Sequence, residues 1–160
     1  MVLVITGNPG VGKHTIAKEI LQSKKHELLD INKIAIDAEI IEKNQDVVDV
    51  DINNLKKYLD DQITEKSLVV GHLAPYVLNS KNINSAIVLR KNPYKLLDIY
   101  KKRGYSEKKT KDNLGSEILG IIANDSITNF GQEKTFQIDT TDSTPKTIVS
   151  KIDDIINRSN

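Results

Sequence analysis

The chain has 160 residues, which suits one compact domain. Its 23 basic and 22 acidic residues nearly cancel, which argues against a protein that coats nucleic acid through general charge. The absence of cysteine excludes a disulfide framework and a cysteine-ligated zinc site. No basic leader precedes the first apolar run and no segment is long enough to span a membrane, so we expect a cytoplasmic protein.

A glycine-rich loop follows the first predicted strand. Met1–Ile5 is continuously apolar, as in a central parallel strand, and residues 7–14 then read Gly-Asn-Pro-Gly-Val-Gly-Lys-His. This is the pattern of a phosphate-binding loop, with His14 where Ser or Thr is expected. A helical spacing of apolar residues begins at Ile16. The order of strand, loop and helix predicts that loop N–H groups and Lys13 hold nucleotide phosphates, the alternative being a turn that binds nothing.

Apolar runs and helical patterns alternate along the rest of the chain. This alternation predicts an α/β fold in which helices flank a five-stranded parallel sheet. The four further strands are expected at Glu27–Asp30, Ser67–His72, Ala86–Arg90 and Thr135–Asp139.

Four further helices are predicted from caps and apolar spacing. Asn92-Pro93 and Thr144-Pro145 each place a capping residue before a proline suited to the first helical position. Leu55, Leu59 and Ile63 share one face of a helix expected at 52–63. A fourth is expected to present a single apolar stripe made of Ile118, Leu119, Ile121 and Ile122.

Two segments interrupt this rhythm. Asp37–Asp51 is polar and acidic, and Lys101–Lys111 is strongly basic and contains Gly104, which should end the preceding helix. Both are candidates for moving parts that close over substrates. The basic run could instead be a solvated face or a contact for RNA.

Candidate phosphate-binding cations lie at the carboxyl edge of the predicted sheet. Ligands of open parallel sheets bind beyond this edge. Besides Lys13, Arg90 and Arg103 are the best placed, and the arginine fork can hold two phosphate oxygens. The alternatives are a strand-end ion pair for Arg90 and a solvated helix end for Arg103. His72 lies where a catalytic group would sit, or it is a hydrogen-bonded structural residue.

The usual protein ligands of Mg²⁺ are altered. Imidazole at His14 replaces the hydroxyl that Mg²⁺ would prefer, and Val70 stands where an acidic residue is expected near the end of the third strand. Thr15 or Asp30 are the candidates to compensate.

Several motifs together resemble the adenylate kinase isoenzyme 6 family, which includes archaeal and eukaryotic nuclear proteins. The resemblance runs over nearly the whole chain, and the ordered set is more specific than the loop alone. The motifs are Gly7–Lys13, Val47–Asp51, Gly71–Ala74, Val88–Arg90, Arg103–Lys109 and Asp112-Asn113. Departures from the family pattern occur at His14, Val70 and Ile99.

This resemblance implies a nucleoside-monophosphate-kinase fold of one P-loop domain, with a monophosphate-binding insert at about residues 30–53 and a lid at about 102–112. It implies ATP and Mg²⁺ as cofactors, and transfer from ATP to AMP, or another nucleoside monophosphate, to give two ADP. It also implies some ATPase activity and a role in small ribosomal subunit maturation, through a small-subunit ribosomal protein and transient contact with pre-ribosomal RNA. The ATP phosphates would be surrounded by Gly10, Val11, Gly12, Lys13, His14 and Thr15, with Arg103 as the lid arginine and His72 as the histidine of the third-strand motif.

Three functions therefore stay open from the sequence. The first is a nucleoside monophosphate kinase acting on AMP, the second is a slow ATPase that acts as an assembly factor, and the third is a nucleotide-binding scaffold with weak catalysis. The acidic residues Asp46, Asp49 and Asp51 repel a phosphate substrate but attract a basic ribosomal protein, which favours a protein partner.

Overall fold

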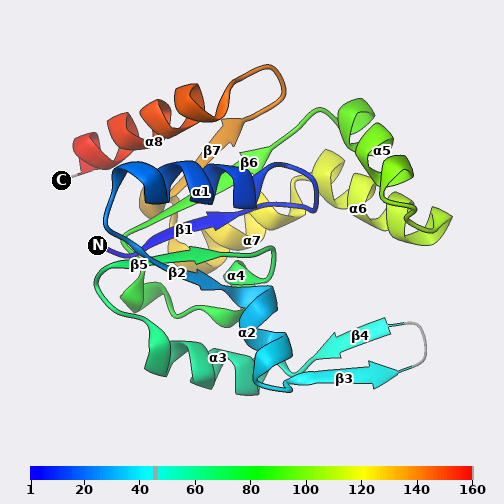
Figure 1. The fold of residues 1–160 in the computed structure, drawn as a ribbon, viewed down its shortest axis with the longest axis horizontal. Coiled ribbons are helices and arrows are strands. Elements are labelled where there is room, and N and C mark those ends of the chain that lie inside the picture. Colours follow the sequence, from blue (N-terminus) through cyan, green and yellow to red (C-terminus); the bar gives the residue numbers. More distant parts are fainter. Residues whose placement is uncertain (45–46, 160) are drawn as a thin grey trace.

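Five parallel strands form the central sheet of the protein (Figure 1). The computed structural model describes residues 1–44 and 47–159. The strand order is β2-β5-β1-β6-β7, so the first strand lies at the centre and the predicted parallel sheet is confirmed. The bounds are β1 Leu3–Thr6, β2 Glu27–Asp30, β5 Ser67–Val70, β6 Ser85–Arg90 and β7 Thr135–Asp139.

Helices cover both faces of this sheet. Apolar residues of α1 and α8 pack on one face, and those of α2, α3, α4 and α7 pack on the other (Figure 1). As predicted, Asn92 and Thr144 cap α5 and α8 by accepting from backbone N–H groups two and three residues on. The helices are α1 Lys13–Ser23, α2 Ile31–Asp37, α3 Ile52–Gln62, α4 Ala74–Val77, α5 Pro93–Lys102, α6 Glu107–Leu119, α7 Ile121–Phe130 and α8 Pro145–Ser159.

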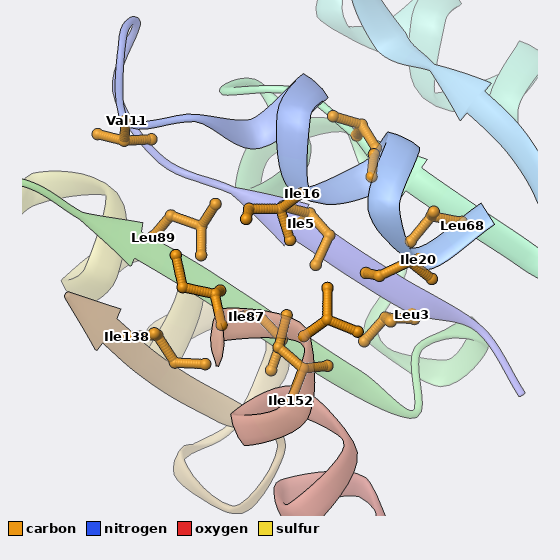
Figure 2. Close-up of a cluster of buried hydrophobic side chains, with 14 of the residues drawn as sticks. Leu3, Ile5, Val11, Ile16, Ile20, Leu68, Ile87, Leu89, Ile138 and Ile152 are labelled. Atoms are coloured by element: carbon orange, nitrogen blue, oxygen red, sulfur yellow. The ribbon is translucent and has the colours of Figure 1, made fainter. Parts of the chain in front are cut away.

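Alternate residues of the central strand enter two separate cores. Leu3 and Ile5 join the cluster under α1 and α8 (Figure 2). Val2 and Val4 join the cluster on the opposite face. All four are at most 5% exposed. The first strand is continuously apolar because neither of its faces meets water.

The segment between α2 and α3 forms an antiparallel hairpin that the sequence pattern did not predict. β3 (Ile41–Asn44) pairs with β4 (Val47–Val50), and the hairpin projects away from the sheet (Figure 1). The carboxylates of Asp30 and Asp51 cap α2 and α3, on either side of it. Asp46, one of the acidic residues singled out in the sequence, lies outside the described residues.

The predicted apolar stripe after the basic segment is wrong. Gly120, at a φ of 64°, ends α6 and begins α7, so Ile118 to Ile122 do not share one helix. Ile118 and Leu119 are 66% and 68% exposed, whereas Ile122 is buried. The residue that α6 buries next to them is Glu117, at 3% exposure. A polar contact, not apolar spacing, therefore sets how this helix is rotated.

Among the described residues, no helix is both long and apolar enough to cross a membrane.

Candidate active site

The phosphate-binding loop connects β1 to α1 at the carboxyl edge of the sheet. Gly7 has a φ of 141°, and a Cβ placed there would lie only 2.5 Å from the carbonyl oxygen of Leu89. Gly10 has a φ of 84° and packs against α5, where a Cβ would meet Ile99 at 3.1 Å. Glycine is required at both positions because the loop is left-handed and pressed against its neighbours. This geometry leaves the N-terminus of α1 facing the loop, as an anion site requires.

Lys13 is the buried cation of this loop. Its side chain is 7% exposed, and Nζ donates to the carbonyl oxygens of Gly7 and Asn8, each at 2.9 Å. Burial, and secondly the positive charge of Arg103, lower the pKa of Lys13 to about 8 from its ordinary 10.5. The partners of this buried ammonium are neutral carbonyls, so a bound phosphate would supply the opposite charge that stabilises it. The loop is therefore suited to an anion.

His14 pairs with the carboxylate that was expected to compensate for the missing acid. Nε2 of His14 lies 2.8 Å from Oδ2 of Asp30, while Oδ1 of Asp30 accepts from the backbone N–H of Lys33. The register of the sheet sets Asp30 directly beside Val70. A metal-binding role for Asp30 stays a prediction, and it would require His14 to release the carboxylate.

Thr15 is the other candidate to hold Mg²⁺. It follows His14 in the first turn of α1 and is exposed, so its hydroxyl is accessible to a ligand. In the part of the chain that the structure describes, no group of three or more His, Asp or Glu side chains could hold a metal ion by itself. A magnesium ion at this loop would therefore need the oxygens of the nucleotide and water as most of its ligands.

His72 and Arg103 approach the loop from two other elements. His72 follows β5, and burial, then the charges of Lys13 and Lys109, lower its pKa below the ordinary 6.5. Arg103 ends α5 and is exposed, yet it is close enough to Lys13 to lower its pKa. The structure thus brings His72 and Arg103 within electrostatic reach of Lys13. Their roles in binding and catalysis stay predictions.

Arg90 is held by the strand-end contacts that the sequence left open as an alternative. Its Nε donates to the Glu117 carboxylate, one terminal nitrogen to the Glu117 carbonyl, and the other to Gln137, each at 2.7 Å. Arg90 also lines a hollow of about 480 Å³ that neither Lys13 nor Arg103 lines. These contacts favour a structural role, and a catalytic role for Arg90 stays a prediction.

A stack of aromatic side chains joins the loop to the predicted lid, and sequence reasoning missed it. The hydroxyl of Tyr100 donates to the carbonyl oxygen of Pro9 at 2.7 Å. The ring of Tyr105 stacks on Tyr100 with centroids 5.0 Å apart, and Nζ of Lys109 lies 3.9 Å from the Tyr105 centroid. Burial raises the pKa of Tyr100 to about 12, which keeps its hydroxyl a donor.

Two further polar residues that contact the loop were also missed. The hydroxyl of Thr140, after β7, donates to the carbonyl oxygen of Val11 at 2.8 Å. The carboxylate of Glu117 accepts from the side-chain amide of Asn8 at 2.8 Å. The position of Thr140 at a polar strand end was its only signal of a contact with the loop. The sequence contained no signal that Glu117 contacts the loop.

The sheet order, the glycine loop and the buried lysine define a P-loop protein with a nucleoside-monophosphate-kinase-like fold. Among solved structures, a gluconokinase from Sinorhizobium meliloti 1021 has a TM-score of 0.60 at 13% identity, covering 98% of this chain and 91% of that one, which is a likeness of fold alone. A family model described as "AAA domain" matches residues 3–120.

Sequence relatives identify the family more closely. A Methanococcus maripaludis protein named "Putative adenylate kinase" is 34% identical over 95% of this chain and 86% of its own length. A Thermococcus kodakarensis protein of the same name is 29% identical over 99% of this chain and 86% of its own length. The chain belongs to this archaeal adenylate kinase family, as its motifs predicted.

Proposed function

We propose that the protein is a nucleoside monophosphate kinase that transfers the γ-phosphoryl group of ATP to AMP. The observation that carries this proposal is the buried Lys13 ammonium, held by loop carbonyls beside the exposed Arg103. Phosphoryl transfer needs mainly positioning and neutralisation of charge, and this site concentrates positive charge where phosphates would bind. The names of the archaeal relatives support AMP as the acceptor.

The loop and its cations would hold the transferred group in line. Loop N–H groups and Lys13 would bind the β- and γ-phosphates, and Arg103 would stabilise the charge that develops on the γ-phosphoryl oxygens. A phosphate oxygen of AMP attacks the γ-phosphorus, the bond to the β,γ-bridging oxygen breaks, and two ADP result. His72 would donate to or accept from a phosphate oxygen near this centre.

Mg²⁺ fits this site only with help from the nucleotide. Thr15 offers the accessible hydroxyl, while Asp30 is engaged by His14. Held there by the Thr15 hydroxyl and the nucleotide, a magnesium ion would neutralise phosphate charge. The insert, with α2 and the β3–β4 hairpin, would bind the monophosphate, and residues 102–112 would act as the lid.

A second candidate is ATP hydrolysis with water as the acceptor. The His14–Asp30 pair fits the slow turnover of this candidate, because Asp30 is engaged by His14 and both hydrolysis and transfer depend on an ordered magnesium ion. The family resemblance extends this candidate to small ribosomal subunit maturation. Acidic residues of the insert suit a basic ribosomal protein, and the lysines of the lid suit pre-ribosomal RNA.

One assay distinguishes these functions. The purified protein is incubated with ATP, Mg²⁺ and each monophosphate in turn, and the products are resolved by ³¹P NMR. A kinase yields ADP only with an acceptor, an ATPase yields ADP and inorganic phosphate without one, and a scaffold yields neither. Lys13→Met should abolish turnover, whereas Lys18→Met, on the exposed face of the same helix, should retain it.

A further inference from the structure

The carboxylate of Glu117, near the end of α6, is buried against the phosphate-binding loop. It is 3% exposed, and Oε2 accepts from Nδ2 of Asn8 at 2.8 Å. Oε1 accepts from Nε of Arg90 at 2.7 Å and from the backbone N–H of Lys91 at 3.1 Å. One carboxylate thus connects the loop, the end of β6 and α6, the helix that begins within the basic segment.

The neighbours of Glu117 show that this contact sets the position of α6. Ile118 and Leu119 follow it in the helix and are 66% and 68% exposed. Burying a carboxylate while two large apolar side chains stay in water is unfavourable unless the carboxylate is fully paired. The hydrogen bonds of Glu117 therefore fix the last turn of α6, and Leu114, one turn earlier, packs against the cluster under α1 and α8. The exposed side chains of Ile118 and Leu119 contribute nothing to this orientation.

Asn8 is the point at which this contact reaches the nucleotide site. Its side chain is 4% exposed, and its backbone carbonyl oxygen is one of the two acceptors that hold the Lys13 ammonium. At the other end of α6, Lys109 is close enough to His72 to lower its pKa. The helix thus links the loop that would bind ATP to the basic segment that would close over it.

We infer that Glu117 is a positioning residue that fixes the phosphate-binding loop through Asn8 and aligns the basic lid with it. This inference rests on the proposed nucleotide site, although it concerns ATP binding and does not require the transfer step. Glutamine at this position cannot accept from Asn8 and from both donors at the end of β6, because one of its two terminal atoms is itself a donor. Asn8 could keep a contact with this glutamine only by turning its own amide over to present Oδ1, and the resulting hydrogen bond would no longer be charge-assisted.

The test compares Glu117→Gln, Asn8→Ala and the double variant with Glu65→Gln, an exposed control. Isothermal titration calorimetry gives the Kd for ATP without requiring turnover. We expect Kd to rise about tenfold in each single variant, because a charge-assisted hydrogen bond is lost. The Kd of the double variant should resemble that of the single variants, because both remove the same contact. The KM for ATP should rise while that for AMP changes little.

Two results would overturn the inference. One is a Kd in Glu117→Gln, or in Asn8→Ala if the former does not fold, equal to that of the unchanged protein. The other is additive effects in the double variant, which would mean that Asn8 and Glu117 act separately. A protein that binds ATP but transfers no phosphoryl group would refute the proposed kinase activity alone, because binding still decides the role of Glu117.

Discussion

Replacing Lys13 by methionine should stabilise the folded protein while abolishing its activity. The ammonium is almost fully buried, and burial, then the charge of Arg103, lower its pKa to about 8 from 10.5. Methionine has a similar length, carries no charge and packs readily in apolar surroundings. The variant thus separates the contribution of Lys13 to phosphate binding from its effect on folding.

The magnitude follows from the difference between the two pKa values. Each unit corresponds to about 1.4 kcal/mol, so the charged lysine weakens folding by about 3 kcal/mol at neutral pH. The carbonyls of Gly7 and Asn8 lose their donor in the variant, which subtracts about 1 kcal/mol and leaves a net gain of about 2 kcal/mol. Below pH 8 both states keep the proton, and between pH 8 and 10.5 only the unfolded chain keeps it. The unchanged protein therefore becomes more stable as pH rises through that window, and the advantage of the variant shrinks.

Urea unfolding at pH 7 and pH 9.5 measures this effect. We expect Lys13→Met to have the higher free energy of unfolding at pH 7 and to lose about half of the burial term at pH 9.5. Lys18→Met, at an exposed position of the same helix, is the control and should change stability little. A variant less stable than the unchanged protein at pH 7, or a gain independent of pH, would refute the electrostatic reasoning.

Three further outcomes are expected. His14→Thr should lower the Mg²⁺ concentration for half-maximal turnover by about tenfold because it restores a hydroxyl ligand, and a magnesium titration that is unchanged would contradict this. The pKa of His72 is lowered, so the acid limb of kcat/KM that it causes should lie below pH 6.5 and vanish in His72→Gln; a limb that survives in the variant would assign it elsewhere. Gly7→Ala should lower the free energy of unfolding by about 2 kcal/mol or more, because its Cβ would lie 2.5 Å from the carbonyl oxygen of Leu89. Gly12→Ala is also strained, by a φ of 101°, but it has open space around it and should be milder. Equal thermal shifts in the two glycine variants would show that the close contact is not the cause.

Local patterns were sufficient to predict the sheet and the phosphate-binding loop. A continuous apolar run such as Met1–Ile5 requires cover on both faces, and the glycine spacing before Lys13 has few other uses. The apolar run and the glycine spacing are each contained in a few consecutive residues. The five strands were therefore expected close to the positions where they occur, whereas the burial of Lys13 became evident only in the structure.

Contacts between distant residues could not be predicted in this way. Asn8 and Glu117 are 109 positions apart, and no spacing rule relates them. Because Glu117 turns inward, the apolar residues beside it face water, and the stripe expected from Ile118 onward fails. The pairing of His14 with Asp30 is likewise tertiary, so the residue that replaces the expected hydroxyl is bound to the carboxylate that was expected to compensate for the missing acid.

The measurement that tests the central claim most directly is ³¹P NMR of the purified protein with ATP, AMP and Mg²⁺. The proposed site predicts that ATP and AMP disappear together, that two ADP appear for each ATP consumed, and that Lys13→Met produces none. Bound ATP with no ADP formed, or ADP and inorganic phosphate released at the same rate without AMP, would contradict the assignment of this site to monophosphate phosphorylation.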